Sequence, residues 1–138
     1  MILRSMKVES FKSLSAVDVE LGQVNVFIGA NGVGKSNLLE AIGVLSAAAD
    51  GLVDDGTLLR RGVRPGLPAI YKSSFRKQRI APQIGLTGRT DHAQYSVFLR
   101  NPVQDPQEAW TFFTETLYEG PRRLVGRSEA SKERGDPS

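Results

Sequence analysis

The sequence predicts an α/β fold in which a buried strand, a glycine-rich loop and a helix follow one another. An apolar run at residues 24–28 is typical of a strand buried on both faces, and apolar residues at helical spacing extend from Asn37 to Ala49. Between them, residues 29–36 read Gly-Ala-Asn-Gly-Val-Gly-Lys-Ser and match the phosphate-binding pattern G-x-x-x-x-G-K-[ST] in full. This order of elements is the context in which the pattern binds phosphates, so we expect a P-loop NTPase fold.

Alternation of apolar and polar residues predicts strands around this unit. It occurs at Met6–Ser10 and at Val17–Leu21, which we expect to form an antiparallel pair beside strand 24–28 in a mixed sheet. The helix should end at Asp50-Gly51, with Gly51 as a left-handed cap. Glycine and proline punctuate residues 51–79, where we expect loops and a short helical turn near Leu58–Arg61.

A second, small antiparallel sheet is expected further along the chain. Residues 83–87 and 94–100 alternate on either side of the turn-rich segment 88–92 and predict a β-hairpin. A third strand is expected from Trp110 to Tyr118, and Glu119-Gly120-Pro121 breaks that run. Residues 127–138 contain no large apolar residue, so we expect a disordered tail after a lobe formed by residues 1–126.

Composition limits the classes of protein to be considered. The 138 residues suffice for one domain with a modest core, and 40% hydrophobic with 24% charged residues is ordinary for a globular protein. The absence of cysteine excludes disulfides and cysteine-based zinc sites. Charges at Arg4, Lys7 and Glu9 interrupt the N-terminal segment, and no apolar stretch is long enough to span a membrane. We therefore expect a cytoplasmic protein without a membrane partner.

The net charge of +3 is unevenly distributed. From Gly56 to Thr90 there is no acidic residue, whereas the basic residues of this segment are Arg60, Arg61, Arg64, Lys72, Arg76, Lys77, Arg79 and Arg89. Such a segment attracts phosphate backbones, and DNA is therefore a candidate partner. The alternative is a solvated surface on a loop-rich segment, and aromatic residues for base stacking are limited to Tyr71 and Phe75.

The loop assigns a role to each of its residues. Glycines at 29, 32 and 34 permit the close backbone approach that phosphates require, and the helix that starts near Lys35 points its N–H groups at them. Lys35 is expected to reach the β- and γ-phosphates, Ser36 to ligate Mg²⁺, and Asn37 to help hold the α-phosphate. The predicted nucleotide-binding residues are Gly29, Ala30, Asn31, Gly32, Val33, Gly34, Lys35, Ser36 and Asn37. The alternative is a glycine-rich turn with a surface lysine and an N-cap serine.

The residues that flank the loop carry a resemblance to a family. Phe11-Lys12-Ser13 follows the first strand, and Gly-Ala-Asn-Gly-Val-Gly-Lys-Ser-Asn follows two strands later, close to Met1. This order resembles the N-terminal part of RecF/SMC-type ATPases of the ABC superfamily, including AAA-type and OLD-nuclease-like relatives. The resemblance is strong over Leu3–Leu45 and weaker to about Gly126, where residues 113–127 look like the end of the family's antiparallel sheet.

The resemblance implies several ligands and partners. It favours ATP with Mg²⁺ over other nucleotides, and it implies an ATP-sandwiched dimer. It matches Asn31 to the family's loop asparagine. It also implies that Lys12 touches phosphates; the alternative is a strand-end lysine in solvent. Roles in DNA repair, chromosome handling or phage defence are what such a family implies.

The hydrolytic residues of the family are not recognisable in the sequence. Its members need a magnesium-sensing glutamine, a Leu-Ser-x-Gly-like signature, a Walker-B strand that ends in Asp-Glu and a switch histidine. The residues that match by type only are Gln83, Gln94, Asp54, Asp55, His92, Glu115 and Glu119. We therefore assign no catalytic residue and expect hydrolysis only with a complementing C-terminal lobe. A non-catalytic nucleic-acid-binding module and a truncated gene product remain as alternatives.

Overall fold

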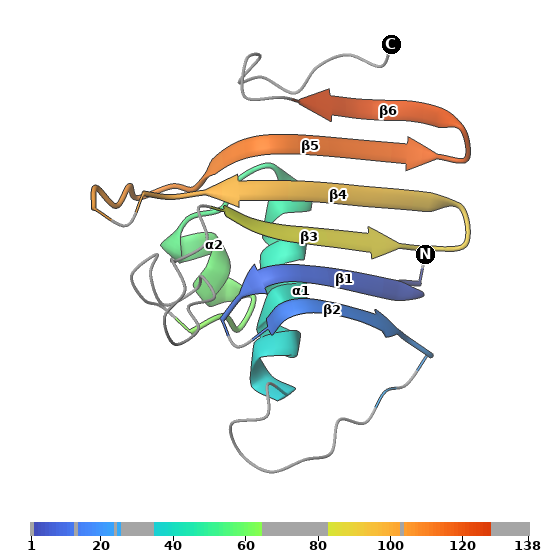
Figure 1. The fold of residues 1–138 in the computed structure, drawn as a ribbon, viewed down its shortest axis with the longest axis horizontal. Coiled ribbons are helices and arrows are strands. Elements are labelled where there is room, and N and C mark those ends of the chain that lie inside the picture. Colours follow the sequence, from blue (N-terminus) through green and yellow to red (C-terminus); the bar gives the residue numbers. More distant parts are fainter. Residues whose placement is uncertain are drawn as a thin grey trace.

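A computed structural model describes residues 2–12, 14–23, 25, 35–64, 83–102 and 104–127. Among these residues, six strands form one antiparallel sheet in the order β2-β1-β3-β4-β5-β6 (Figure 1). The strands are β1 (Ser5–Phe11), β2 (Leu14–Glu20), β3 (Gln83–Arg89), β4 (Ala93–Arg100), β5 (Thr111–Glu119) and β6 (Arg122–Arg127). The helices are α1 (Lys35–Asp50) and α2 (Asp55–Arg60), and both lie between β2 and β3 in the chain.

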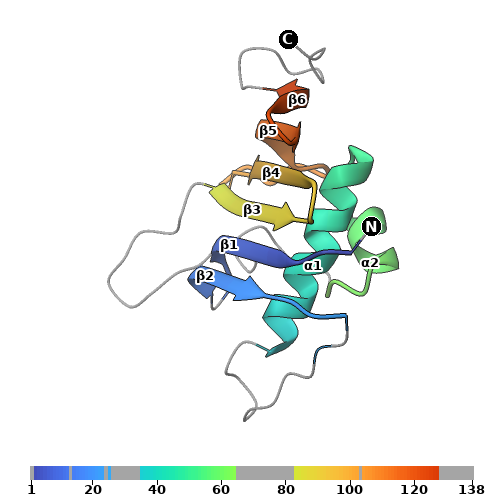
Figure 2. The same ribbon diagram turned by 90° about the vertical axis from the view of Figure 1, so that its right-hand side faces the viewer.

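Helix α1 crosses one face of the sheet, and α2 lies beside α1 on the side away from the strands (Figure 2). The core forms where α1 meets the central strands. Its buried apolar residues include Leu38, Ala41, Val44, Leu45 and Ala48 of α1, Met6 and Val8 of β1, Ile84 and Leu86 of β3, and Val97 and Leu99 of β4. The spacing of three and four residues along α1 places these side chains on one stripe. Neither described helix has the length and apolarity needed to cross a membrane.

The local elements agree with the sequence prediction. The expected helix is α1, and Gly51 after it has φ of 96°, as expected for a left-handed cap. The expected helical turn is α2. The expected hairpin is β3–β4, in which Ile84 pairs with Leu99 and Leu86 with Val97.

The expectation of two separate sheets is wrong for the described strands. Strand β1 pairs with β2 on one edge and with β3 on the other, so that Val8 lies between Val17 and Leu86. The hairpin therefore continues the N-terminal pair instead of forming a sheet of its own. One continuous sheet lets a single helix cover the apolar residues of β1, β3 and β4 together. The predicted strand at 24–28 lies outside the described residues, except for Asn25.

The break expected at Glu119-Gly120-Pro121 is a hairpin turn. Gly120 has φ of 56°, a conformation that glycine adopts without strain, and the chain returns as β6 with Leu117 opposite Val125. The sheet therefore extends to Arg127, as the family resemblance implies. The predicted disordered tail begins at 127, but Arg127 is the last residue of β6, and residues 128–138 lie outside the described part of the chain.

Asp54 caps α2 and should make the fold sensitive to acid. Its carboxylate accepts a hydrogen bond from the Thr57 backbone N–H at 2.8 Å, and the Thr57 hydroxyl accepts one from the Asp54 N–H at 2.9 Å. The Thr57 N–H is the main cause that lowers the pKa of Asp54 below its usual value. Because the folded pKa is depressed, the stabilisation is present above the unfolded pKa and is lost as pH falls through the folded pKa.

We therefore expect Asp54→Asn to lose less stability than the wild type between pH 7 and pH 3. Asparagine keeps an acceptor at the cap but does not titrate. Urea unfolding at both pH values measures the difference. Asp55→Asn, at an exposed neighbouring position outside the capping pair, is the control. If the wild type and Asp54→Asn lose the same free energy of unfolding between pH 7 and pH 3, Asp54 does not have this role.

Candidate nucleotide-binding site

The glycine-rich motif leads directly into α1. The helix begins at Lys35, so Lys35 and Ser36 occupy its first positions, where backbone N–H groups lack intrahelical partners. Ser36 is exposed, and Asn37 is half-buried. Residues Gly29–Gly34 and the side chain of Lys35 lie outside the described residues. Helix α1 thus begins where the motif ends, and the phosphate site itself stays a prediction.

A buried carboxylate in α1 collects two basic side chains from distant segments. The Glu40 side chain is 7% exposed; its Oε2 accepts a hydrogen bond from Lys12 Nζ and its Oε1 accepts one from Arg64 Nε. Arg64 Nη2 also donates to Asn37 Oδ1 at 3.1 Å. Lys12 follows β1 and Arg64 follows α2. Three segments therefore meet at the first turns of α1, and we call Lys12, Asn37, Glu40 and Arg64 the Glu40 cluster.

Lys12 is not the solvent-exposed strand-end lysine that one alternative describes. Its side chain is 8% exposed in the ion pair with Glu40. The backbone around it is unusual, because Ser10 has φ of 59° and Lys12 has φ of 49°. Left-handed conformations of non-glycine residues cost roughly 1–2 kcal/mol each. The fully buried side chain of Phe11 lies between them and, together with the ion pair, holds the segment in this conformation.

The charge of the Glu40 cluster suits an anionic ligand. Lys12 and Arg64 contribute two positive charges and Glu40 one negative charge, which leaves an excess of one positive charge. The start of α1 adds the positive end of the helix dipole. The described residues hold no group of three or more His, Asp or Glu side chains arranged for a metal ion. The exposed Ser36 hydroxyl is an oxygen ligand of the kind that Mg²⁺ accepts.

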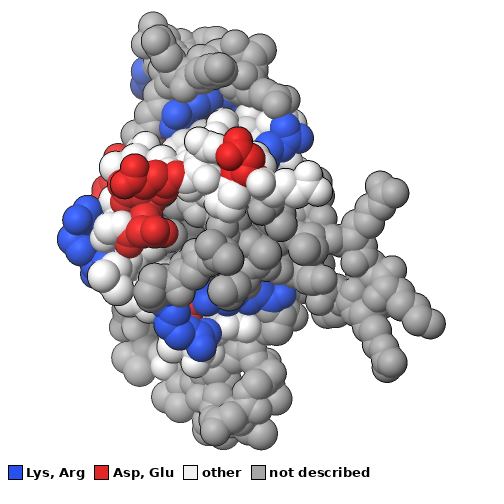
Figure 3. All heavy atoms as spheres, turned by 90° about the vertical axis from the view of Figure 1, so that its left-hand side faces the viewer, with Lys and Arg blue, Asp and Glu red and all other residues white. Residues whose placement is uncertain are grey.

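The acid-free basic segment is less available to nucleic acid than its composition suggests. Arg61 pairs with Asp50 and donates to the Ser46 hydroxyl at 3.0 Å, and Arg89 donates to Gln94 Oε1 at 3.1 Å. Arg64 belongs to the Glu40 cluster. Figure 3 shows acidic side chains beside basic ones among the described residues of one face. Of the other basic residues, Arg60 is exposed in α2, and Lys72, Arg76, Lys77 and Arg79 lie outside the described part.

Two of the acidic residues that match hydrolytic positions by type, Asp54 and Glu115, have structural roles. Asp54 caps α2, as described above. Glu115 is fully buried; it accepts a hydrogen bond from the Tyr95 hydroxyl at 2.7 Å and pairs with Arg127, whose Nη2 lies 2.7 Å from Glu115 Oε2. His92 lies exposed in the turn between β3 and β4, as expected. The structure brings none of these residues into the Glu40 cluster.

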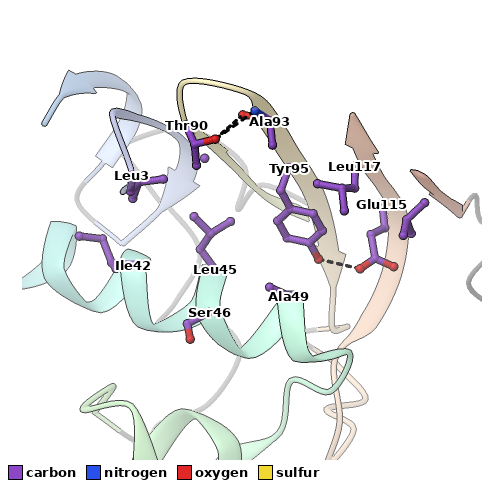
Figure 4. A pocket seen from close by; sticks show the side chains of 12 residues that line it. Leu3, Ile42, Leu45, Ser46, Ala49, Thr90, Ala93, Tyr95, Glu115 and Leu117 are labelled. Carbon is purple, nitrogen blue, oxygen red and sulfur yellow. Dashed lines mark hydrogen bonds between the residues drawn. The ribbon is translucent and has the colours of Figure 1, made fainter. Parts of the chain in front are cut away.

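A cavity of about 540 Å³ opens at the other end of α1 (Figure 4). Leu45 and Ala49 of α1 face Tyr95 of β4 and Leu117 of β5 across it, and the Tyr95 hydroxyl points toward the buried Glu115. Ala49 is about 20 Å from Lys35 along the helix. A mostly apolar lining with a carboxylate offers phosphates no favourable contact. This cavity, lined by described residues, is thus not where the motif predicts the nucleotide.

Comparison with known proteins identifies the family of the chain. A family model for the AAA ATPase domain matches residues 1–76, which is more than half of the chain. The chain belongs to the AAA ATPase domain family. The matched span contains the glycine-rich motif, α1 and the whole Glu40 cluster. AAA ATPase domains use nucleotide, usually with Mg²⁺, so the coarse ligand class follows from membership in the family.

Similarity to RecF proteins confirms the predicted RecF-type resemblance. The DNA replication and repair protein RecF of Clavibacter michiganensis subsp. michiganensis is 29% identical over 141 residues, which cover 100% of this chain and 32% of that protein. RecF of Paenarthrobacter aurescens is 42% identical over 69 residues, 49% of this chain and 17% of that protein. RecF of Porphyromonas gingivalis is 39% identical over 64 residues, which cover 45% of this chain and 18% of that protein. The chain spans about a third or less of the length of these relatives.

Proposed function

We propose that this AAA ATPase domain binds Mg-ATP through residues 29–37. The observation that carries the proposal is the complete phosphate-binding motif that runs into the first turn of α1 inside the matched family span. Lys35 would contact the β- and γ-phosphates, and the exposed Ser36 would supply its hydroxyl to Mg²⁺. The excess positive charge of the Glu40 cluster supports an anion at this end of α1.

For these 138 residues the proposal is nucleotide binding. ATP hydrolysis would need a complete ATPase head, in which further parts join this domain. No magnesium-sensing glutamine, signature motif, Walker-B strand or switch histidine is recognisable in the sequence. A complementing C-terminal lobe and an ATP-sandwiched dimer would supply them. Since the relatives are DNA replication and repair proteins, we propose that the head acts in DNA repair in the cytoplasm.

Calorimetric titration with ATP tests the binding step. The folded protein should bind ATP at one site in the presence of Mg²⁺, and more weakly when EDTA removes the ion. Ser36→Ala should bring the affinity with Mg²⁺ down toward the affinity in EDTA and leave the EDTA value unchanged, because only the metal contact is lost. A folded protein that releases no heat with Mg-ATP would overturn the proposed function.

DNA is the second candidate ligand, because the acid-free segment Gly56–Thr90 carries eight basic residues. Arg61, Arg64 and Arg89 have partners in the fold and Arg60 lies in α2, so we propose that DNA binding depends on the four basic residues clustered further along the sequence, Lys72, Arg76, Lys77 and Arg79. Affinity for a short duplex should fall steeply with salt if these residues neutralise phosphates. Replacing the four by glutamine should flatten that dependence, whereas Arg89→Gln should not. An unchanged slope after the fourfold replacement would contradict DNA binding by this segment.

A further inference from the structure

We propose that Glu40 is a positioning residue of the phosphate site. In this proposal Glu40 holds Lys12 and Arg64 beside the first turns of α1, so that their positive charges act on the phosphates of the nucleotide. The inference rests on the proposed function, because the phosphates are those that the glycine-rich motif is expected to bind. Glu40 itself would not touch the ligand.

The burial and pairing of Glu40 carry the first step. A carboxylate that is 7% exposed must be paired, because an isolated buried charge is strongly unfavourable. One basic partner would satisfy that requirement. Glu40 instead has a different partner on each oxygen, and the partners are separated from it by 28 and 24 residues in the sequence. The carboxylate therefore brings two segments together, and their combined charge exceeds its own.

The conformation of the two basic residues carries the second step. A lysine or arginine side chain loses up to about 2 kcal/mol of conformational entropy when it is ordered. In the Glu40 cluster that ordering is already present, because Glu40 binds both side chains and Asn37 binds Arg64 a second time. Asn37 directly follows the motif. A ligand that uses pre-ordered charges binds more tightly than one that must order them.

A second ion pair of α1 provides a matched control. Asp50, the last residue of α1, pairs with Arg61, just as Glu40 pairs with Arg64, so both pairs connect α1 to the segment at the end of α2. The Asp50 side chain is 68% exposed, and Asp50 lies about 22 Å from Lys35 along the helix. Asp50→Asn therefore removes a similar connection without approaching the phosphate site.

The experiment compares Glu40→Gln, Lys12→Met, the double variant and Asp50→Asn with the wild type. Affinity is measured with a fluorescent ATP analogue, and pyrophosphate serves as a competitor without a base. Glu40→Gln and Lys12→Met should each lower the affinity for both ligands by about tenfold, which corresponds to ~1.4 kcal/mol. The affinity loss of the double variant should be much smaller than the product of the two single-variant losses, because the two residues act as one unit. Asp50→Asn should stay within about twofold of the wild type, since its charge is distant and screened.

Several outcomes would overturn the inference. If folded Glu40→Gln binds both ligands like the wild type, Glu40 stabilises the fold only. Likewise, if the affinity loss of the double variant equals the product of the losses of Glu40→Gln and Lys12→Met, Glu40 stabilises the fold only. Should Glu40→Gln fail to fold, Lys12→Met decides alone, because it leaves Glu40 paired with Arg64, and unchanged affinity in that variant refutes the proposal. If the wild type binds neither ligand, the proposed function is refuted as well. If the wild type binds and Lys35→Ala abolishes that binding, the proposed function stands even where the role of Glu40 fails.

Discussion

Lys35→Ala should lower the affinity for Mg-ATP by about 100-fold, which corresponds to ~2.7 kcal/mol. The lysine of the motif GVGKS carries a charge that the pattern places against the β- and γ-phosphates. Hydrogen bonds to charged groups contribute roughly 1.5–3 kcal/mol each, so losing this one residue accounts for a loss of that size. Calorimetry or fluorescence titration of wild type and variant measures it, with circular dichroism to show that both are folded.

Arg60→Ala is the control for this prediction. Arg60 is exposed in the last turn of α2, so its replacement removes the same charge from the surface without changing the motif. We expect an affinity within about twofold of the wild type, because the charge of an exposed side chain outside the motif is weakened by salt screening. Equal affinity of folded Lys35→Ala and wild type for Mg-ATP would mean that the loop is a glycine-rich turn without a phosphate role.

Arg127→Met should destabilise the protein by about 3–5 kcal/mol, the typical loss when one partner of a buried ion pair is removed. Glu115 is 0% exposed, and Arg127 donates to its Oε2 from both Nε, at 3.0 Å, and Nη2, at 2.7 Å. Methionine preserves much of the apolar packing against Phe112, over whose ring the Arg127 guanidinium lies at 3.9 Å. Urea unfolding at pH 7 measures the change in the free energy of unfolding.

Two further variants separate the ion pair from other effects. Arg122→Met changes an exposed arginine at the start of the same strand and should shift stability by no more than about 0.5 kcal/mol. Glu115→Leu combined with Arg127→Met should recover most of the loss, because an apolar pair of similar volume avoids burying a charge. If Arg127→Met alone unfolds with wild-type stability, Glu115 does not depend on Arg127.

Local features of the fold could be predicted from the sequence, and long-range ones could not. The periodicity of α1 and the alternation in β3 and β4 depend on neighbouring residues and indicate the correct elements. The pairing of β1 with β3 joins segments such as Val8 and Leu86, which no local pattern connects. A strand has two edges, and which segment occupies the second edge depends on how the whole sheet covers α1.

In the candidate site, too, local features could be predicted from the sequence and long-range contacts could not. The glycine-rich motif is contiguous and could be found by its spacing alone. Glu40 could not, because an acidic residue next to the exposed Leu39 in a helix is usually on the surface, and its partners lie far away in the sequence. The acid-free segment misleads for a related reason. The carboxylates that pair with Arg61 and Arg64 are Asp50 and Glu40, which precede that segment and lie in α1.

Amide chemical shifts during a titration with Mg-ATP test the central claim most directly. With saturating Mg-ATP, we expect the largest changes at residues 29–37 and a smaller change at Lys12, while Tyr95 and Leu117 at the cavity stay unchanged. Lys35→Ala should remove these changes at the same ligand concentration. If saturating Mg-ATP leaves residues 29–37 unshifted, or if the largest changes occur around the cavity, the nucleotide does not bind at the start of α1.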